Sequence, residues 1–232
     1  MSLPNKTQLL PNRPGIPPMA AHPEAETIDP AALARAYADG DIDLICVLGP
    51  TASGKTRYAV QLARALGNAE ILSADSRQVY RGMDIGTGKD LGEYGEVPYH
   101  LIDIVPAGSK YNIYEFQAAF ADAWADVRRR GAIPILCGGS GLYIEAATRA
   151  YKFEAGNGVP ASALPQHTYY IGTLVTREER VARIDRRLDE RLEDALIEEI
   201  QGLLASGIPA DDLLWYGLEY KFVTQYVLGE IS

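Results

Sequence analysis

Residues 49–56 read Gly49-Pro50-Thr51-Ala52-Ser53-Gly54-Lys55-Thr56, a glycine-rich loop that ends in Gly-Lys-Thr. An apolar run at 44–48 precedes the loop, and a helical pattern at 55–66 follows it. Glycines let backbone N–H groups turn inward around an anion, and the helix N-terminus adds partial positive charge. Lys55 adds a full charge for an outer phosphate, and the Thr56 hydroxyl can ligate Mg²⁺. The stretch therefore predicts a phosphate-binding loop between a strand and a helix, with Mg²⁺ as cofactor.

Outward from this loop, short apolar runs alternate with helical patterns. We expect strands at 44–48, 70–74, 100–105, 133–137 and 169–175. Helices are expected at 30–39, at 55–66, from Asn112 to residue 131 and from about 142, with a loop at 156–166. This alternation predicts an α/β fold of the P-loop NTPase type, a mostly parallel sheet flanked by helices. Its ligands should gather at the carboxyl ends of the strands.

A long helix is predicted after the last strand. Thr176 and Glu179 form a capping box at its start, and Gly207 stops it after residue 206. Its apolar residues recur at spacings of three and four, so one face of the whole helix is expected to be core: Val181, Ile184, Leu188, Leu192, Leu196, Ile200 and Leu203. The Pro-rich residues 1–28 are expected to form a mobile tail, which leaves 29–232 as one P-loop domain.

Composition limits the classes of function. The chain has 232 residues and a formal net charge of -9, so its surface as a whole is not a basic nucleic-acid platform. Its two cysteines, Cys46 and Cys137, lie in apolar runs, which favours reduced, buried thiols and a cytoplasmic location. No stretch of eighteen consecutive apolar residues occurs, so no membrane span is expected.

Side chains near the loop suggest further site residues. Asp75 follows a predicted strand, where a carboxylate can hold Mg²⁺ or take a proton, although turn aspartates are also common there. Ser140 follows the strand at 133–137 in a second glycine-rich turn, as a helix cap, a ligand contact or both. Arg180, Arg183, Arg187 and Arg191 border the apolar stripe of the long helix. Most of them fit a salt-bridged exposed face, and one or two can reach a diphosphate. The three histidines and two cysteines show no zinc spacing.

Three motifs together resemble the tRNA dimethylallyltransferase (isopentenyltransferase) family. They are the loop at 49–56, the segment Ser-Ala-Asp-Ser-Arg-Gln-Val-Tyr-Arg-Gly-Met-Asp-Ile-Gly-Thr at 73–87, and the turn Gly-Gly-Ser-Gly-Leu-Tyr at 138–143. Weaker matches lie at 100–104, 183–187 and 216–220, and the resemblance spans roughly 43–153 and 168–231. The second motif is long and more specific than any phosphate-binding loop.

The resemblance implies transfer of a dimethylallyl group from its diphosphate to the N6 amine of an adenine, in tRNA the one next to the anticodon. The loop at 49–56 would hold the diphosphate, and Lys55, Arg187 and Mg²⁺ would stabilise its charge. Asp75 would act as base on the amine, with Thr51 and Ser140 flanking the reacting groups. Asp75, Ser76, Arg77, Gln78 and Ser140 would grip the adenosine, which leaves its stack to react.

The chain departs from the family pattern in three places. Ser140 replaces a threonine, only residues 150–168 stand where a tRNA-gripping helical insertion is expected, and no basic segment follows the region at 217. Together with the acidic charge, these departures keep transfer to free AMP, ADP or ATP open as an alternative. A small-molecule kinase and a non-catalytic diphosphate-binding paralogue also remain open.

Overall fold

The structure is a computed structural model that describes residues 25–149 and 158–231. The predicted mobile tail at 1–28 falls almost wholly outside the described residues, and the boundary at 28 and 29 stays a prediction. Helix α1 (Pro30–Ala38) begins where predicted, because the Asp29 side chain accepts a hydrogen bond from the Ala31 N–H at 2.9 Å. None of the helices in the described ranges is long and apolar enough to cross a membrane.

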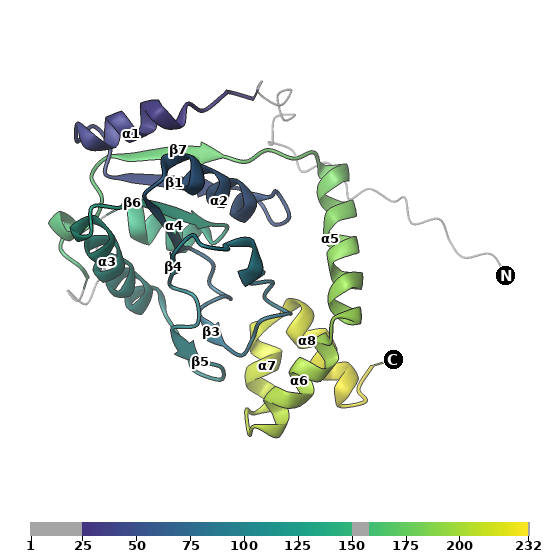
Figure 1. Cartoon of the computed structure of the whole chain (residues 1–232). Coiled ribbons are helices and arrows are strands. Elements are labelled where there is room, and N and C mark those ends of the chain that lie inside the picture. Colours follow the sequence, from purple (N-terminus) through teal and green to yellow (C-terminus); the bar gives the residue numbers. More distant parts are fainter. Residues whose placement is uncertain (1–24, 150–157, 232) are drawn as a thin grey trace, which may run out of the picture.

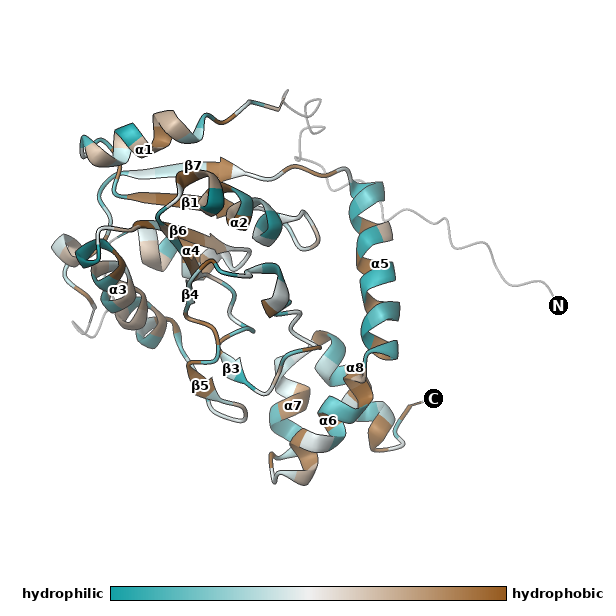
Figure 2. Ribbon diagram, viewed as in Figure 1, coloured by the Kyte–Doolittle hydropathy of each residue, from teal (hydrophilic) through white to brown (hydrophobic). Residues whose placement is uncertain are grey.

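A parallel sheet forms the centre of the molecule (Figure 1), as predicted. Its strands are β4 (Tyr99–His100), β2 (Ala69–Ser73), β6 (Ile133–Gly138), β1 (Leu44–Leu48) and β7 (Thr168–Gly172), in that spatial order. Strands β2 and β6 are buried along their whole length and β1 along nearly all of it, as their unbroken apolar runs require. Figure 2 shows these central strands as hydrophobic.

Helices cover both faces of this sheet. Ile45 and Val47 of β1 pack in one core with α1 and with α2 (Lys55–Leu66). Leu44 and Cys46 point to the other face, toward α3 (Ile113–Arg129) and α4 (Gly141–Thr148). The capping box of Asn112 and Glu115 starts α3 as predicted. Both cysteines are free and buried, and burial raises the pKa of each thiol to about 12.

The predicted strand at 100–105 is wrong. Only Tyr99 and His100 pair with β2, because the backbone turns through left-handed conformations at Leu101 (φ 66°) and Asp103 (φ 57°). The chain then forms β5 (Val105–Pro106), which pairs with β3 (Tyr80–Arg81) in a separate two-stranded sheet. Leu101 and Ile102 are buried without being in a strand, so the apolar run reflects core packing alone.

The predicted single helix at 176–206 is two helices. The Thr176–Glu179 capping box does start α5 (Arg177–Glu193), but Ala195 turns left-handed (φ 75°) and α6 (Leu196–Ala205) begins after it. Helix α8 (Leu218–Val227) packs against both α6 and α7 (Ala210–Tyr216). The short 3₁₀ turns Leu91–Glu93 and Ala161–Ala163 lie in loops.

The predicted core face holds for α6 but not for α5. Leu196, Ile200 and Leu203 are buried, whereas the apolar residues of α5 are 38–46% exposed: Val181, Ile184, Leu188 and Leu192. Helix α5 stands apart from the sheet, joining β7 to the C-terminal helices (Figure 1). Arg183, Arg187 and Arg191 of α5 instead line the cavity described below.

Candidate active site

The glycine-rich loop turns sharply between β1 and α2. Ala52 (φ 60°) and Gly54 (φ 83°) are left-handed, and Gly54 precedes α2 with no side-chain cap among the described residues. The first N–H groups of α2 are therefore free for an anion. Lys55 Nζ donates to the Pro50 carbonyl at 2.8 Å, which folds the ammonium back over the loop. Ser53 is buried and shares a 2.7 Å hydrogen bond with Thr173, a residue that no sequence motif singles out.

The second glycine-rich turn brings Ser140 to Asp75. A Cβ on Gly138 would overlap the Ala74 backbone, so only glycine lets the ends of β6 and β2 approach this closely. Ser140 Oγ accepts from the Ser76 N–H at 2.9 Å and lies 3.1 Å from Ser76 Oγ. Asp75 Oδ1 accepts from the Arg77 N–H at 2.9 Å. Ser140 and the Asp75 segment thus form one wall beside the phosphate-binding loop.

The arginines of α5 form the opposite wall. Arg187 donates to the Gly88 carbonyl and pairs with Asp90, and Arg191 donates to the Gly86 carbonyl and pairs with Glu219 at 3.0 Å. Arg183 reaches the Ala52 carbonyl at 3.4 Å. These bonds run across to other elements rather than along α5. Arg187 and Arg191 are therefore two arginines that do not belong to the salt-bridged exposed face expected of most of this set.

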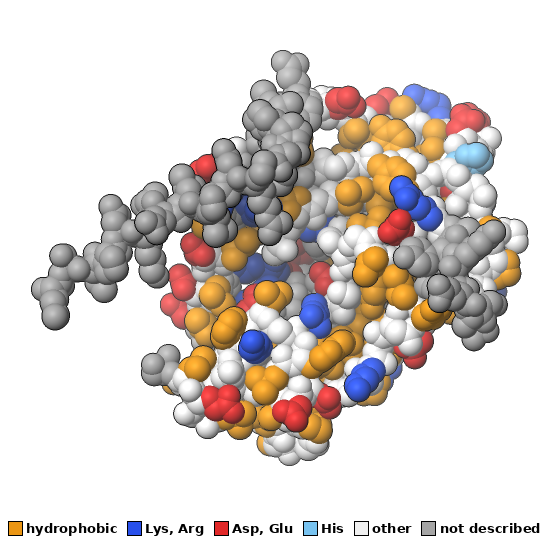
Figure 3. Space-filling view, turned by 180° about the vertical axis from the view of Figure 1, so that it is seen from behind, with side chains coloured by type: hydrophobic (Ala, Val, Ile, Leu, Met, Phe, Trp, Pro, Cys, Tyr) orange, Lys and Arg blue, Asp and Glu red, His pale blue; other side chains and the backbone are white. Residues whose placement is uncertain are grey.

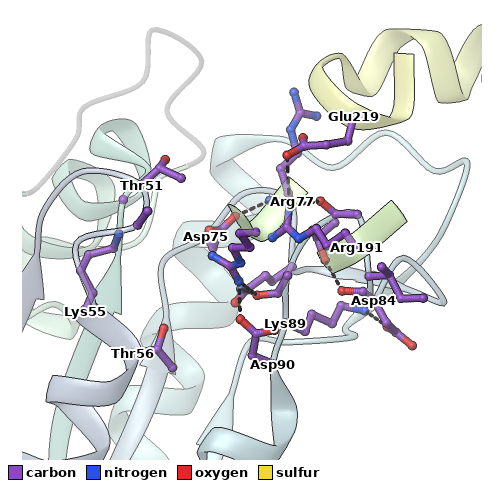
Figure 4. A pocket seen from close by; sticks show the side chains of 18 of the residues that line it. Thr51, Lys55, Thr56, Asp75, Arg77, Asp84, Lys89, Asp90, Arg191 and Glu219 are labelled. Carbon is purple, nitrogen blue, oxygen red and sulfur yellow. Dashed lines mark hydrogen bonds and ion pairs between the residues drawn. The ribbon is translucent and has the colours of Figure 1, made fainter. Parts of the chain in front are cut away.

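A cavity of about 1370 Å³ lies between these walls. Figure 4 shows Thr51 and Lys55 on one side of it, across from Asp75, Arg77 and Arg191. The predicted site residues that line the cavity are Thr51, Ala52, Gly54, Lys55, Thr56, Asp75, Ser76, Arg77, Gln78, Ser140 and Arg187; Gly49, Pro50 and Ser53 are not among the lining residues. Sequence reasoning offered Arg191 only as one of four candidate arginines, and it missed Asp84, Lys89, Asp90 and Glu219; all five line the cavity.

The charged groups in the cavity alter one another's pKa values. Burial lowers the pKa of Lys55, Cys137 and Asp75 oppose that shift in part, and the positive charge of Arg187 adds a little to it. Burial and the neighbouring Arg187 likewise lower the pKa of Arg191, against the pull of Glu219. Several cations therefore share a partly dry site, an arrangement that favours a multiply charged anion.

Residues 84–90, the clamp loop, connect the two walls. The ammonium of Lys89 is buried, with 1% of its side chain exposed, and bonds Asp84, Asp103 and the Tyr80 carbonyl. From outside, Glu199 of α6 accepts from the N–H groups of Asp84, Ile85 and Gly86 at 2.7–3.2 Å. The Gly88 carbonyl of the same loop accepts hydrogen bonds from the Gln78 and Arg187 side chains. The clamp loop thus sets the position of the α5 arginines. Its two closely spaced glycines, Gly86 and Gly88, were the sequence feature that could have marked it as part of the site.

A divalent cation site built from protein carboxylates alone is not present in the described parts of the chain, where no three His, Cys, Asp or Glu side chains converge. The Thr56 hydroxyl lines the cavity at the start of α2. Mg²⁺ commonly takes one or two protein oxygens and completes its shell with water and substrate phosphates. The donor set therefore fits Mg²⁺ delivered with a diphosphate.

Comparison with known proteins identifies the source of this arrangement. The family model described as IPP transferase matches residues 78–166 and 152–232, and one described as isopentenyl transferase matches 42–94. The chain is 39% identical to tRNA dimethylallyltransferase 2 of Bacteroides fragilis, covering 83% of this chain and 81% of that protein. It is 42% identical to tRNA dimethylallyltransferase 1 of Porphyromonas gingivalis, covering 81% and 80%.

Solved structures agree with these relatives. The tRNA isopentenylpyrophosphate transferase of Bacillus halodurans is 29% identical, with a TM-score of 0.69 over 82% of this chain and 78% of that one. The corresponding enzyme of Staphylococcus epidermidis gives a TM-score of 0.71, also at 29% identity, and each chain is covered to 82%.

One difference from the relatives is internal. The match to Bacteroides fragilis extends over 249 residues, more than the 232 of this chain, so the relative has additional residues inside the matched region. The two pieces of the IPP transferase match meet at 152–166, between α4 and β7, where the sequence lacks the expected insertion. With the fold, the cavity and the relatives in agreement, the chain belongs to the tRNA dimethylallyltransferase (isopentenyltransferase) family.

Proposed function

We propose that this protein transfers a dimethylallyl group from dimethylallyl diphosphate to the N6 amine of an adenine in tRNA. The observation that carries the proposal is the convergence of Lys55, Asp75 and Arg187 on one cavity in a chain of this family. A carboxylate and a cationic anion-binding wall are the two groups that this displacement needs. The family assignment favours prenyl transfer over the kinase alternative.

The diphosphate end would lie against the loop at 49–56. The α2 N-terminus, Lys55 and the arginines Arg187 and Arg191 would bind the oxygens on which negative charge grows as the allylic C–O bond breaks. Thr56 would hold Mg²⁺, which when bound supplies further neutralisation of the diphosphate charge. Thr51, at the exposed rim of the loop, would contact the reacting end.

The acceptor end would lie at Asp75. Adenine N6 is a weak nucleophile because its lone pair is delocalised, so a carboxylate that accepts its proton assists attack. A C–N bond forms to the allylic carbon, the C–O bond to the diphosphate breaks, and the amine proton passes to Asp75. Ser76, Arg77, Gln78 and Ser140 would orient the base, since the network around Asp75 holds them in place.

A free adenine nucleotide is the second candidate acceptor. The absent internal residues between α4 and β7 favour it, because the family's RNA-gripping insertion is expected there. Either acceptor is available in the cytoplasm. The two free, buried thiols fit that reducing compartment as well.

The test supplies labelled dimethylallyl diphosphate and Mg²⁺ with unmodified tRNA or AMP. We expect label in tRNA; label in AMP alone would make the nucleotide the acceptor, and label in neither would refute transferase activity. In calorimetry with a non-cleavable diphosphate analogue, Lys55→Ala should weaken binding, whereas Asp75→Ala should spare binding and lower the transfer rate. Lys110→Ala, at an exposed lysine away from the cavity, is the matched control.

A further inference from the structure

Leu218 is held in a costly conformation at the cavity. Its backbone is left-handed (φ 47°), and it follows Gly217, whose φ of 73° and ψ of −168° suit only glycine. A left-handed backbone is costly for leucine because its Cβ crowds the following carbonyl oxygen. Yet the side chain gains no burial in return, since 70% of it is exposed. A strained backbone that presents a large apolar side chain to solvent is a feature of binding sites rather than of cores.

The turn that carries Leu218 is rigid. Tyr216 on one side is buried, and its hydroxyl accepts from the Gly108 N–H at 2.9 Å. Tyr220 on the other side is also buried, and its hydroxyl donates to Glu199 at 2.5 Å. Because Glu199 also binds the clamp loop, Leu218 is fixed relative to the α5 arginines. The backbone that carries the Leu218 side chain is therefore fixed beside the cavity before any ligand arrives.

Leu218 belongs to an exposed strip that continues from the cavity to the outer surface. Residues 216–220 line the cavity, and two exposed aromatic residues lie close by in sequence: Trp215 near the end of α7, 61% exposed, and Phe222 in α8, 59% exposed. We call Trp215, Leu218 and Phe222 the Leu218 strip. The lower part of Figure 3 shows hydrophobic side chains interspersed with both basic and acidic side chains on this end of the molecule.

Cations sit on the rings of the strip. The Arg77 guanidinium lies 5.8 Å from the Trp215 ring centroid, and the Lys221 ammonium lies 5.7 Å from that of Phe222. Arg77 also lines the cavity two residues after Asp75, which ties the strip to the acceptor end. Aromatic rings paired with basic side chains are the usual platform for unpaired nucleotides.

We propose that Leu218 is an apolar wedge that packs against the bases flanking the reacting adenine, with Trp215 and Phe222 as stacking surfaces for the adjoining nucleotides. The inference rests on the proposed function. An adenine that leaves its stack exposes the faces of its neighbours, and inserted apolar side chains cover such faces in other nucleic-acid complexes. RNA fits better than a second copy of the chain because the strip begins at the cavity and carries cations on its rings.

The test compares Leu218→Gly with Leu218→Met and Leu188→Ala. Leu218→Gly removes both wedge and strain, so its melting temperature should not fall. Its KM for tRNA should rise roughly 5- to 150-fold, the effect of losing one base stack. Its KM for dimethylallyl diphosphate should stay unchanged. Leu218→Met should retain tRNA affinity, and Leu188→Ala, an exposed leucine of α5 outside the cavity lining, should behave as the wild type.

Binding of tRNA with 2-aminopurine at the target adenine reports unstacking without transfer. The 2-aminopurine fluorescence should rise when the tRNA binds the wild type or Leu218→Met. It should rise much less when the tRNA is saturated with Leu218→Gly. Absence of transfer by the wild type would refute the proposed function. Wild-type transfer with unchanged tRNA KM and fluorescence in Leu218→Gly would overturn the wedge alone. A wild-type dimer that Leu218→Gly dissociates in sedimentation would assign the strip to self-association and overturn it as well.

Discussion

The buried ammonium of Lys89 allows a sharp prediction, the effect of Lys89→Met. Methionine keeps most of the side-chain volume and removes the charge, so packing changes little. Three acceptors then lose their donor: Asp84, Asp103 and the Tyr80 carbonyl at 2.7 Å. The clamp loop loses the centre on which it is folded.

The magnitude follows from the exposure of each acceptor. The Tyr80 carbonyl, on a buried residue, loses its charged donor at a cost of about 1–3 kcal/mol. The Asp84 and Asp103 side chains are 59% and 36% exposed, so water replaces much of what they lose, and each contributes only about 0.5–1 kcal/mol. Together these give roughly 3 kcal/mol, the lower end of the range for breaking a buried ion pair.

Urea unfolding measures this loss. With a slope near 2–3 kcal/mol/M, a 3 kcal/mol loss shifts the midpoint by about 1 M at unchanged slope. Adding Asp103→Asn should recover part of it, because one unpaired carboxylate is removed, and Lys110→Met serves as the exposed control. Affinity for inorganic pyrophosphate should also fall, since the clamp loop positions Arg187. A midpoint shift below about 0.3 M would refute the view that Lys89 holds the loop.

Three further predictions concern other parts of the fold. Ala195→Gly should stabilise the chain by up to about 1 kcal/mol in urea unfolding, because φ is 75° there; destabilisation would mean that the helix break is not strained. Gly88→Ala should weaken pyrophosphate binding in calorimetry, since its Cβ would collide with the Arg187 guanidinium; unchanged affinity would dismiss that contact. Burial alone would raise the pKa of Glu70, but hydrogen bonds from Arg130 and a histidine outweigh it and hold the pKa below its usual value. The stability that Glu70 contributes is therefore present above the unfolded pKa near 4.3 and lost as pH falls below it, an acid loss that Glu70→Gln should reduce in melts between pH 6 and 3.

The features that the sequence predicted well are local ones. The loop at 49–56 and the Asn112 capping box form from residues a few positions apart, so their geometry is written in the spacing. The strand at 100–105 failed because apolar residues mark burial, and Leu101 is buried in a turn. The break at Ala195 interrupts a regular apolar spacing without glycine or proline to mark it.

The missed site residues depend on distant partners. Arg191 and Glu219 are 28 positions apart, and Glu199 reaches the clamp loop across more than 110 positions. On a helical wheel the arginines and the apolar stripe of α5 are distinct faces, but the wheel does not say which face meets the protein. An apolar face usually packs on the protein and a charged face is usually exposed. In α5 the arginines line the cavity and the apolar residues are exposed instead.

Helix α5 has no buried residue along its described length, and it joins the rest of the chain mainly through arginine contacts across the cavity. Such a segment has little apolar packing to resist local opening, so its amides should exchange with solvent faster than those of α3. A diphosphate bound between Lys55 and Arg187 would bridge the phosphate loop to this helix. The bound substrate would then stabilise α5 against local opening, which its few apolar contacts do not do. Slower amide hydrogen exchange in α5 would therefore report that the cavity is occupied.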